Sequence, residues 1–442
     1  MKLNRANLAK MNHNHPERAK ERIVHIGLGA FHRAHQAWYT AKADRDQTWG
    51  IVAFTGRNPE AANLLAEQDG LFTLVTRDAN GDSFEVIDSI VRAEDGNNLE
   101  AFIEAIASSK TAIVTLTITE AGYGMNAEGH VDLANPPAAL QRLANALEVR
   151  RRANGLGLAV VSCDNMPNNG HLLSVAMRDL FSAFGQESLD WLIANVSFVS
   201  TSIDRITPKT TESDIEQVKK ATGWSDSSPV VTEPFSDWVL QGNFPLGRPQ
   251  WELSGATFVD EIEPFENRKL WLLNGSHSLL AYFGQLLGHK TVAEAIADNA
   301  CLEAVQNYWD EAARHLLEDG LNVPAYREAL LERYQNPRIA HQLAQIAIDG
   351  STKLRVRIAP VAKAEIAAGR SAAACAVAFG AWVNYVLSTE DLKDSQLDLI
   401  KGALRNEPEQ IAACLISIID PDLAGNSEFM KLVSKASELQ KI

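Results

Sequence analysis

The sequence has few of the features that disulfide-bonded, metal-bound or membrane proteins need. Its 442 residues include only 4 cysteines, which lie far apart and form no CxxC pair: Cys163, Cys301, Cys375 and Cys414. A disulfide scaffold or a zinc knuckle requires closely spaced cysteines, so neither is encoded. No uncharged apolar run reaches about 18 residues, the length of a membrane-spanning helix. We therefore expect neither a structural metal nor a membrane partner.

Positive charge is also scarce. The chain has 41 Lys+Arg against 56 Asp+Glu, a formal net charge of −15. Nucleic acids and anionic membranes are bound through basic surfaces, so this balance excludes general binding of either. The N-terminal segment is polar and lacks the apolar core of a signal peptide. We expect a cytoplasmic monomer or small homo-oligomer whose partner is a small molecule.

Short apolar runs alternate with helical patterns through the first part of the chain. Strands are expected at 22–26, 50–54, 111–119 and 158–162, a hairpin at 72–87, and helices at 34–43, 99–109 and 138–152. This alternation predicts an α/β domain with a mainly parallel, doubly wound sheet. Helical spacing then dominates, at 265–287, 293–317, 325–334, 339–348, 372–387 and 397–404. We expect two domains, 1–255 and 256–442, the second mainly α-helical.

A glycine-rich turn follows the first expected strand and opens a helix. In Gly27-Leu-Gly29-Ala-Phe-His32 two glycines stand where a dinucleotide pyrophosphate approaches the backbone at a helix N-terminus. His32 replaces the third glycine of the usual pattern, so a tight turn without a ligand fits about as well. Arg33 and His35 either assist an anionic ligand or are solvated helix residues. The spacing of the two histidines is not that of a metalloprotease helix, so we expect no metal here.

The end of the second strand carries the signal for cofactor preference. NAD sites commonly place an Asp or Glu there, whereas a nearby Arg accommodates the 2′-phosphate of NADP. This chain has Arg57 first and Glu60 three residues later. The sequence therefore leaves both NAD and NADP open.

Four polar residues share one expected helix. At about 100° per residue, Glu266, Lys269, Asn274 and His277 fall within an arc of roughly 140° on a helix that is otherwise apolar. Buried polar groups need partners, so an internal hydrogen-bond network is one interpretation. The other is oxidoreductase chemistry, because burial moves the pKa of a lysine towards neutrality and lets it act as a base. Asn274 and His277 then hold the alkoxide, and Glu266 carries the proton to solvent.

Two further polar clusters follow expected strands. They are 162–170 and 202–208, and sites in open α/β sheets form beyond the carboxyl ends of strands. Of their residues we place Asn165 and Asp204 in the site. Asn168 is expected to cap a helix instead.

Together these motifs resemble the polyol-specific long-chain dehydrogenase/reductase family, also called the mannitol dehydrogenase family. The resemblance runs from about residue 22 to beyond 420. It rests on five motifs in order: Gly27-x-Gly29-x-Phe-His-Arg-x-His35, Thr117-Ile-Thr-Glu120-Ala-Gly122-Tyr123, Cys163-Asp-Asn165, Asp204-Arg-Ile-x-Pro208 and Lys269-x4-Asn274-x2-His277.

The resemblance implies a Rossmann-type domain, a helical domain, and hydride transfer between a nicotinamide cofactor, usually NAD, and a sugar-alcohol or sugar-acid carbon. It implies that Lys269 is the acid/base, that Asn165 and Asn274 form the oxyanion hole, and that His277 and Asp204 bind substrate. Glu266 is implied as a proton gate. The implied cofactor-binding residues are Gly27, Gly29, Phe31, His32, Arg33, Arg57 and Glu120. Tyr123 is expected near the nicotinamide end.

Within the family, the motifs are most similar to those of fructuronate reductases, also called mannonate oxidoreductases. A uronate carries a carboxylate, and Lys353, Arg355 and Arg357 are grouped in the sequence where one would be bound. A solvated basic face explains the trio equally well. The leading hypothesis is NADH-dependent reduction of a 2-keto sugar acid, with Lys353 and Arg357 as substrate ligands. A mannitol 2-dehydrogenase and a nucleotide-binding sensor without chemistry are the alternatives, and a metal hydrolase using the N-terminal histidines is a distant third.

Overall fold

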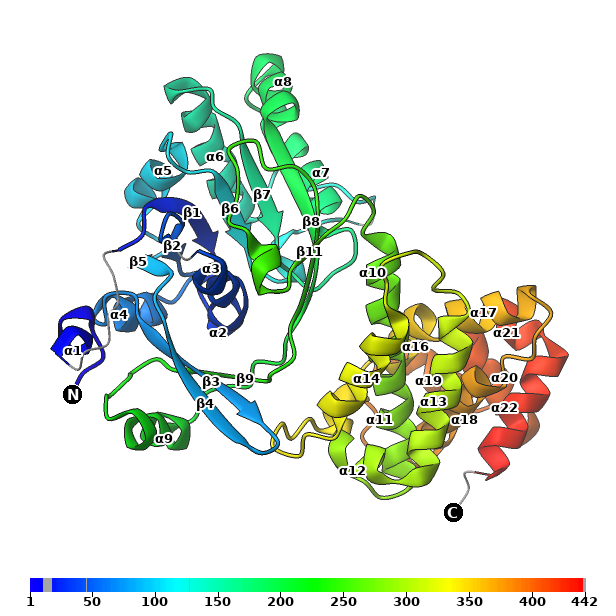
Figure 1. The fold of residues 1–442 in the computed structure, drawn as a ribbon. Helices are drawn as coiled ribbons and strands as arrows, with labels where there is room; N and C mark the ends of the chain where they lie inside the picture. Colours follow the sequence, from blue (N-terminus) through cyan, green and yellow to red (C-terminus); the bar gives the residue numbers. More distant parts are fainter. Residues whose placement is uncertain (11–17, 45, 127, 440–442) are drawn as a thin grey trace. The chain divides into compact units, whose positions relative to one another are not determined.

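The computed structural model describes residues 1–10, 18–44, 46–126 and 128–439. The chain divides into two compact units, Met1–Glu263 and Pro264–Ile442 (Figure 1). The first combines sheets with helices, and the second is helical. This confirms the expected fold class of a doubly wound sheet followed by a mainly helical part.

The first unit is organised by an eight-stranded sheet with the order β11-β10-β8-β7-β6-β1-β2-β5. The six strands β8-β7-β6-β1-β2-β5 run parallel to one another, β10 is antiparallel to β8, and β11 is parallel to β10. The strands are β1 Glu21–Ile26, β2 Gly50–Phe54, β5 Ile90–Glu94, β6 Ile113–Leu116, β7 Leu158–Ser162, β8 Val196–Asp204, β10 Asp237–Gln241 and β11 Thr257–Phe258.

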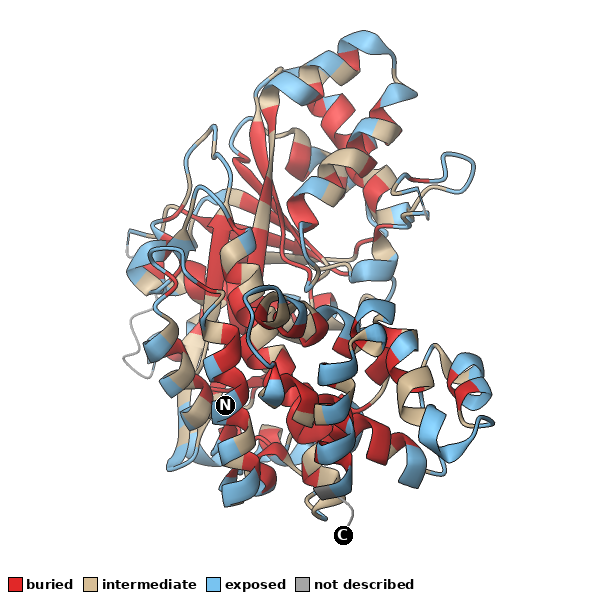
Figure 2. Ribbon diagram, turned by 90° about the vertical axis from the view of Figure 1, so that its right-hand side faces the viewer, coloured by how far each residue is buried: buried red, intermediate tan, exposed pale blue. Residues whose placement is uncertain are grey.

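Both faces of this sheet are buried. Along β2, Ile51 and Ala53 join one apolar cluster while Val52 and Phe54 join another, because successive side chains point to opposite faces. The helices of the unit are α1 Arg5–Lys10, α2 Ala30–His32, α3 Trp38–Ala43, α4 Glu60–Ala66, α5 Leu99–Ala107, α6 Ala138–Ala153, α7 Asn169–Ser182, α8 Gln186–Asn195 and α9 Glu212–Thr222. Figure 2 shows the strands as buried and the helices with exposed outer faces.

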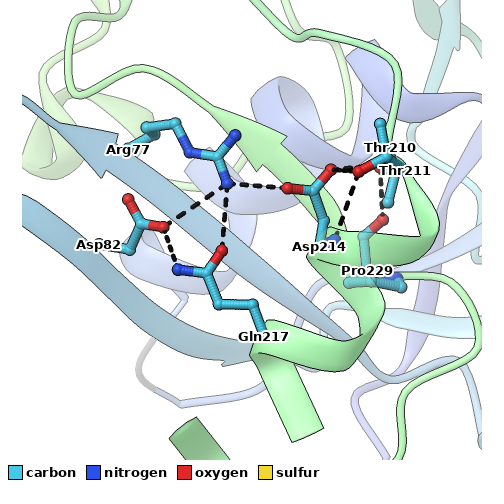
Figure 3. Close-up of polar contacts among 7 residues, drawn as sticks. All are labelled: Arg77, Asp82, Thr210, Thr211, Asp214, Gln217 and Pro229. Atoms are coloured by element: carbon cyan, nitrogen blue, oxygen red, sulfur yellow. Dashed lines mark hydrogen bonds and ion pairs between the residues drawn. The ribbon is translucent and has the colours of Figure 1, made fainter. Parts of the chain in front are cut away.

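A second, three-stranded sheet has the order β4-β3-β9, with β3 Phe72–Asp78, β4 Gly81–Ile87 and β9 Val230–Thr232. The hairpin expected at 72–87 is confirmed by the antiparallel pairing of β3 with β4. Arg77 of β3 donates to Asp214 of α9 at 2.8 Å (Figure 3). Asp214 also accepts the Thr211 N–H, which completes a capping box at the start of α9.

Arg150, near the end of α6, is fully buried. Its guanidinium makes five hydrogen bonds at 2.7–3.1 Å, all to backbone carbonyl oxygens: those of Ile106, Ser108, Thr111, Leu156 and Gly157. One side chain thereby ties the end of α5, the entry to β6 and the entry to β7 to α6.

The second unit packs around α11 and α18. The buried side chains of these helices include Leu279, Tyr282, Phe379 and Trp382. The helices are α10 Glu263–Arg268, α11 Ser276–Leu286, α12 Val292–Ala297, α13 Asn299–Ala313, α14 Val323–Tyr334, α15 Leu343–Ile346, α16 Gly350–Arg357, α17 Ala359–Ala367, α18 Ala373–Ser388, α19 Leu397–Ala403, α20 Pro408–Ile419, α21 Pro421–Gly425 and α22 Ser427–Leu439. No helix among the described residues is both long and apolar enough to cross a membrane.

Three sequence expectations need correction. The strand expected at 111–119 is confined to β6, because the chain turns sharply after Thr117. Of the helix expected at 339–348 only α15 is formed. The helix expected at 34–43 begins at α2 and passes through a π-helical segment, η1 Arg33–Ala37, before α3.

Candidate active site

The glycine turn lies at the point where the strand order of the large sheet reverses. Strand β1 pairs with β2 on one side and β6 on the other, so the turns after β1 and β6 are neighbours. Gly27 has φ +106°, and a side chain there would overlap the carbonyl oxygen of Thr117. The N–H groups of Gly27 and Leu28 both bond the Phe54 carbonyl at 2.9 Å. Ligands bind at such reversal points in doubly wound sheets.

The histidines of this turn are buried and neutral. The rings of His25 and His32 stack with centroids 3.3 Å apart and an interplanar angle of 8°. Burial lowers the pKa of His25 to about 3 and takes the pKa of His32 well below its usual value. His25 bonds Thr115 Oγ1 at 2.8 Å and Thr117 Oγ1 at 3.1 Å. Stacked rings hold their lone pairs in parallel planes, so these two cannot converge on one metal ion.

Arg33 and His35 are not solvated, and this correction removes one of the two interpretations left open for them. Arg33 is buried, and its guanidinium donates to Ser228 Oγ at 2.8 Å and to the Gly29 carbonyl at 3.2 Å. His35 is buried against Phe31 and Trp238, at ring distances of 5.1 and 5.3 Å. Arg33 thereby fixes the backbone of the glycine turn, whatever else it contacts.

The remaining candidates of this unit stand at the carboxyl ends of successive strands. Arg57 is exposed after β2, Glu120 is exposed in the short helix η2 Glu120–Gly122 after β6, and Asn165 is exposed after β7. Asp204 is the last residue of β8 and is buried. The sheet thus brings these residues to the edge where its parallel strands end. Asn168 stands at the N-cap position of α7 in a left-handed conformation, but its side chain makes no capping bond, so that expectation is wrong.

The lysine segment of the helical unit is π-helical. η4 Lys269–Gly275 lies between α10 and α11, so the α-helical geometry used for the arc of roughly 140° does not hold through it. In a π-helix the bond runs from residue i to i+5, which places Asn274 about one turn from Lys269. The two side chains therefore share a face more closely than an α-helix would allow.

Side chains from three other helices stabilise this wider turn. Trp309 Nε1 donates to the Leu272 carbonyl at 2.9 Å, and the Tyr334 hydroxyl donates to the Leu273 carbonyl at 3.1 Å. Arg357 Nη1 is 3.3 Å from the Asn274 carbonyl. These donors satisfy three successive carbonyl groups, which is how an irregular helix is tolerated in a core.

Lys269 and His277 are buried, whereas Asn274 and Glu266 are half-buried. Burial takes the pKa of His277 well below its usual value, and nearby His341, Arg333 and Arg357 lower it further. His277 is therefore neutral and carries one ring N–H. Its ring packs on Tyr334 and His341, at centroid distances of 4.8 and 5.1 Å.

A cationic cluster lies beside His277 and His341, and we define it as Arg333, Lys353 and Arg357. Burial and Arg357 lower the pKa of Lys353, and burial lowers the pKa of Arg357. Burial lowers the pKa of His341, and Arg333 and Lys353 lower it further. Sequence reasoning missed Arg333, which belongs to α14 and to none of the motifs.

The expected basic trio is divided. Lys353 and Arg357 are one helical turn apart on α16. Arg355 points to α20 instead, where it donates to the carbonyls of Ile418 at 2.6 Å and Ile419 at 3.1 Å. The interpretation of a solvated basic face is also wrong for Arg357, which bonds Ser278 Oγ at 3.0 Å.

The candidate residues thus form two sets, one at the strand ends of the α/β unit and one around η4. Two family models divide the chain in the same order. The mannitol dehydrogenase Rossmann domain matches residues 21–253, and the mannitol dehydrogenase C-terminal domain matches residues 261–440. The chain belongs to the mannitol dehydrogenase family. It is therefore an oxidoreductase of the family that acts on CH–OH groups.

Relatives in this family cover almost the whole chain. D-mannonate oxidoreductase of Escherichia coli is 33% identical over 452 residues, 95% of this chain and 93% of the relative. Mannitol 2-dehydrogenase of Pyricularia oryzae is 34% identical over 461 residues, 95% and 90% of the two chains. The structure of Pseudomonas fluorescens mannitol 2-dehydrogenase in a ternary complex with NAD and D-mannitol is 32% identical, with a TM-score of 0.78 over 99% of this chain and 96% of that one.

Proposed function

We propose that this member of the mannitol dehydrogenase family uses NADH to reduce a 2-keto sugar acid to its alditol acid, and NAD for the reverse reaction. D-fructuronate and D-mannonate are the leading pair. The observation that favours an acidic substrate over a neutral one is the cationic cluster beside His277 and His341. Arg357 lowers the pKa of half-buried Lys353, so the cations grouped here repel one another, and a substrate carboxylate relieves that repulsion.

The α/β unit fits a dinucleotide. Gly27 keeps the turn free of side chains, and a Cβ at Gly29 would meet only the Gly27 carbonyl, at 3.7 Å. The backbone is thus open for the pyrophosphate where the helix begins. Arg57 and Glu60 are exposed beyond β2, where the adenosine ribose is recognised, so they set the choice between NAD and NADP.

The cofactor supplies the hydride, and the residues of the chain handle the proton. Lys269 gives its proton to the carbonyl oxygen during reduction and takes it back during oxidation. The amide groups of Asn165 and Asn274 donate to the developing alkoxide, and neutral His277 donates its ring N–H. Asp204 accepts from a substrate hydroxyl, and half-buried Glu266 connects Lys269 to solvent.

A mannitol 2-dehydrogenase is the second candidate. It is supported by relatives of that name, which match this chain as well as D-mannonate oxidoreductase does. A sensor that binds the nucleotide without chemistry is less consistent with the chain, because a pure binder has no use for a buried lysine.

A substrate panel tests the proposal. D-fructuronate, D-tagaturonate, D-fructose and D-xylulose are offered with NADH and with NADPH, and kcat/KM is measured. Turnover of uronates above that of the neutral ketoses supports the acid, and turnover of fructose alone overturns it. Tight NADH binding with no turnover of any of the four favours the sensor.

A pair of variants on α16 sharpens this test. Arg357→Met removes one cluster cation, and the KM for the uronate is expected to rise about ten- to hundred-fold. The KM for a neutral ketose should change much less. Arg355→Met is the matched control, because Arg355 lies on the same helix but bonds α20. Equal changes in the two variants contradict a carboxylate at Arg357.

A further inference from the structure

The turn after β6 contains a strained residue. Thr119 has φ +66°, in the left-handed region that β-branched residues avoid. It is followed directly by Glu120 and η2. Strain at a non-glycine residue persists only where the surroundings impose the conformation, and it gathers at functional sites.

Asp164 imposes this conformation. Its side chain is buried and accepts the Thr119 N–H at 2.7 Å and the Ile118 N–H at 3.2 Å. Tyr123, at the far end of the same turn, donates its hydroxyl to Asp164 at 2.9 Å. The carboxylate therefore holds the turn at both ends, from the bend that follows β7.

The backbone of Asp164 is itself fixed. Asn169 Nδ2 donates to the Asp164 carbonyl at 2.9 Å and to the Thr201 carbonyl at 2.7 Å. The Tyr123 hydroxyl also bonds Ser162, the last residue of β7. A chain of buried hydrogen bonds thus runs from β8 through Asp164 to the turn after β6.

That turn contacts the glycine turn through Thr117, whose hydroxyl donates to the Gly27 carbonyl at 2.9 Å. The reversal point of the sheet lies between these two turns. Asp164 thus fixes one wall of the place where a dinucleotide is bound, and the residue that follows it is Asn165. Burial raises the pKa of Asp164, while the Ile118 and Thr119 amides and Tyr123 oppose that rise.

We propose that Asp164 is a positioning residue for hydride transfer: its carboxylate holds the strained Thr119 turn that seats the nicotinamide, and its main chain sets Asn165. The inference rests on the proposed cofactor function and adds a residue to it. An ionised carboxylate only accepts, which matches three donors converging on it. An asparagine in its place turns an N–H towards at least one of those donors.

Asp164→Asn is the direct test. The Kd for NADH is expected to stay within about three-fold, because the pyrophosphate turn is untouched, while kcat falls about 100-fold. The emission of bound NADH, which reports the surroundings of the nicotinamide, should revert towards that of the free cofactor. Tyr123→Phe removes one of the three donors and keeps both amides, so a smaller loss of kcat is expected. Tyr123→Phe is the variant that tests the proposal if Asp164→Asn does not fold.

Asp214→Asn is the matched control in the same unit. Asp214 is also a buried carboxylate that accepts a backbone N–H, but it stands in the first turn of α9 and bonds Arg77 of β3 (Figure 3). Its loss should lower the melting temperature and leave kcat and the bound-NADH emission unchanged. Wild-type kcat and emission in Asp164→Asn, or an equal loss in Asp214→Asn, overturn the inference. A wild-type protein that binds NADH but reduces no substrate overturns the reductase proposal alone, and the emission of Asp164→Asn still decides the role of Asp164.

Discussion

The two π-helical segments in the described part of the chain, η1 and η4, have opposite electrostatic surroundings. Around η1 the rings of His25 and His32 are neutral and stacked, and Arg33 is bonded to Gly29 and Ser228. Around η4 burial lowers the pKa values of His277 and His341, and neighbouring cations lower them further: Arg333 and Arg357 for His277, Arg333 and Lys353 for His341. The first region is held by hydrogen bonds and packing within the chain. The second concentrates positive charge that an anion would neutralise.

We propose that the region around η1 serves cofactor binding and the region around η4 serves the chemistry. A turn that is fixed in advance binds a cofactor without reorganisation, so changes there should affect cofactor affinity. A half-buried cationic site acts on the charge of the substrate, so changes there should affect kcat or the KM for the substrate. The predictions below test this division, from the largest effect to the smallest.

Lys269→Ala should reduce kcat by about three orders of magnitude or more, because the alkoxide then has no acid/base. The Kd for NADH, measured by fluorescence titration, should change little. Lys363→Ala is the control, since Lys363 pairs with Asp420 and Asp422 at the surface. Retention of most activity at neutral pH in Lys269→Ala would remove the proton-transfer role.

Gly27→Ala should weaken NADH binding by about 100-fold or more, because the new methyl group overlaps the Thr117 carbonyl at a positive φ. Isothermal titration gives the affinity, and kcat at saturating NADH should fall less. Gly402→Ala is the control, because a methyl group added at this helical glycine would meet no atom within 4 Å. This variant is expected to bind NADH normally. Normal binding in both variants would place the cofactor elsewhere.

Acid should destabilise both regions through their buried histidines. The pKa of His25 is about 3 in the folded protein against about 6.5 unfolded, so the unfolded chain takes up the proton first as the pH falls. The contribution of neutral His25 to the free energy of unfolding is complete above about pH 6.5. Below that pH it falls by about 1.4 kcal/mol per pH unit. The free energy of unfolding, measured with urea between pH 5 and 8, should depend less steeply on pH in His25→Asn. The difference in slope should correspond to about one proton fewer taken up on unfolding. The exposed His171→Asn should retain the slope of the wild type.

Arg57→Ala should have the smallest effect. Arg57 is exposed beyond β2, so its removal should lower the kcat/KM ratio of NADPH to NADH by a few-fold and leave the NADH reaction nearly unchanged. Glu60→Ala is the reciprocal variant, expected to shift the ratio the other way. A ratio that neither variant moves would show that the ribose is recognised by other residues.

The sequence predicted the strands well where burial on both faces leaves a continuous apolar run, as at 50–54 and 158–162. It could not predict η4, because one extra residue in a turn leaves no mark on a helical pattern. The division of the basic trio could have been predicted, because residues four apart share a helix face and residues two apart do not. Arg333 and Asp164 were missed for another reason. Their importance comes from neighbours that are distant in the sequence.

Arg150 bears on the order in which the first unit assembles. Its five carbonyl partners come from three segments, and a guanidinium that leaves water before all of them are placed is buried without compensation. Docking of α6 and the pairing of β6 with β7 should therefore be one cooperative event rather than two. Only arginine presents five N–H groups in a fixed fork, so no other residue could link these steps. Arg150 thereby secures the starts of the two strands, β6 and β7, whose opposite ends lead to Thr119 and Asn165.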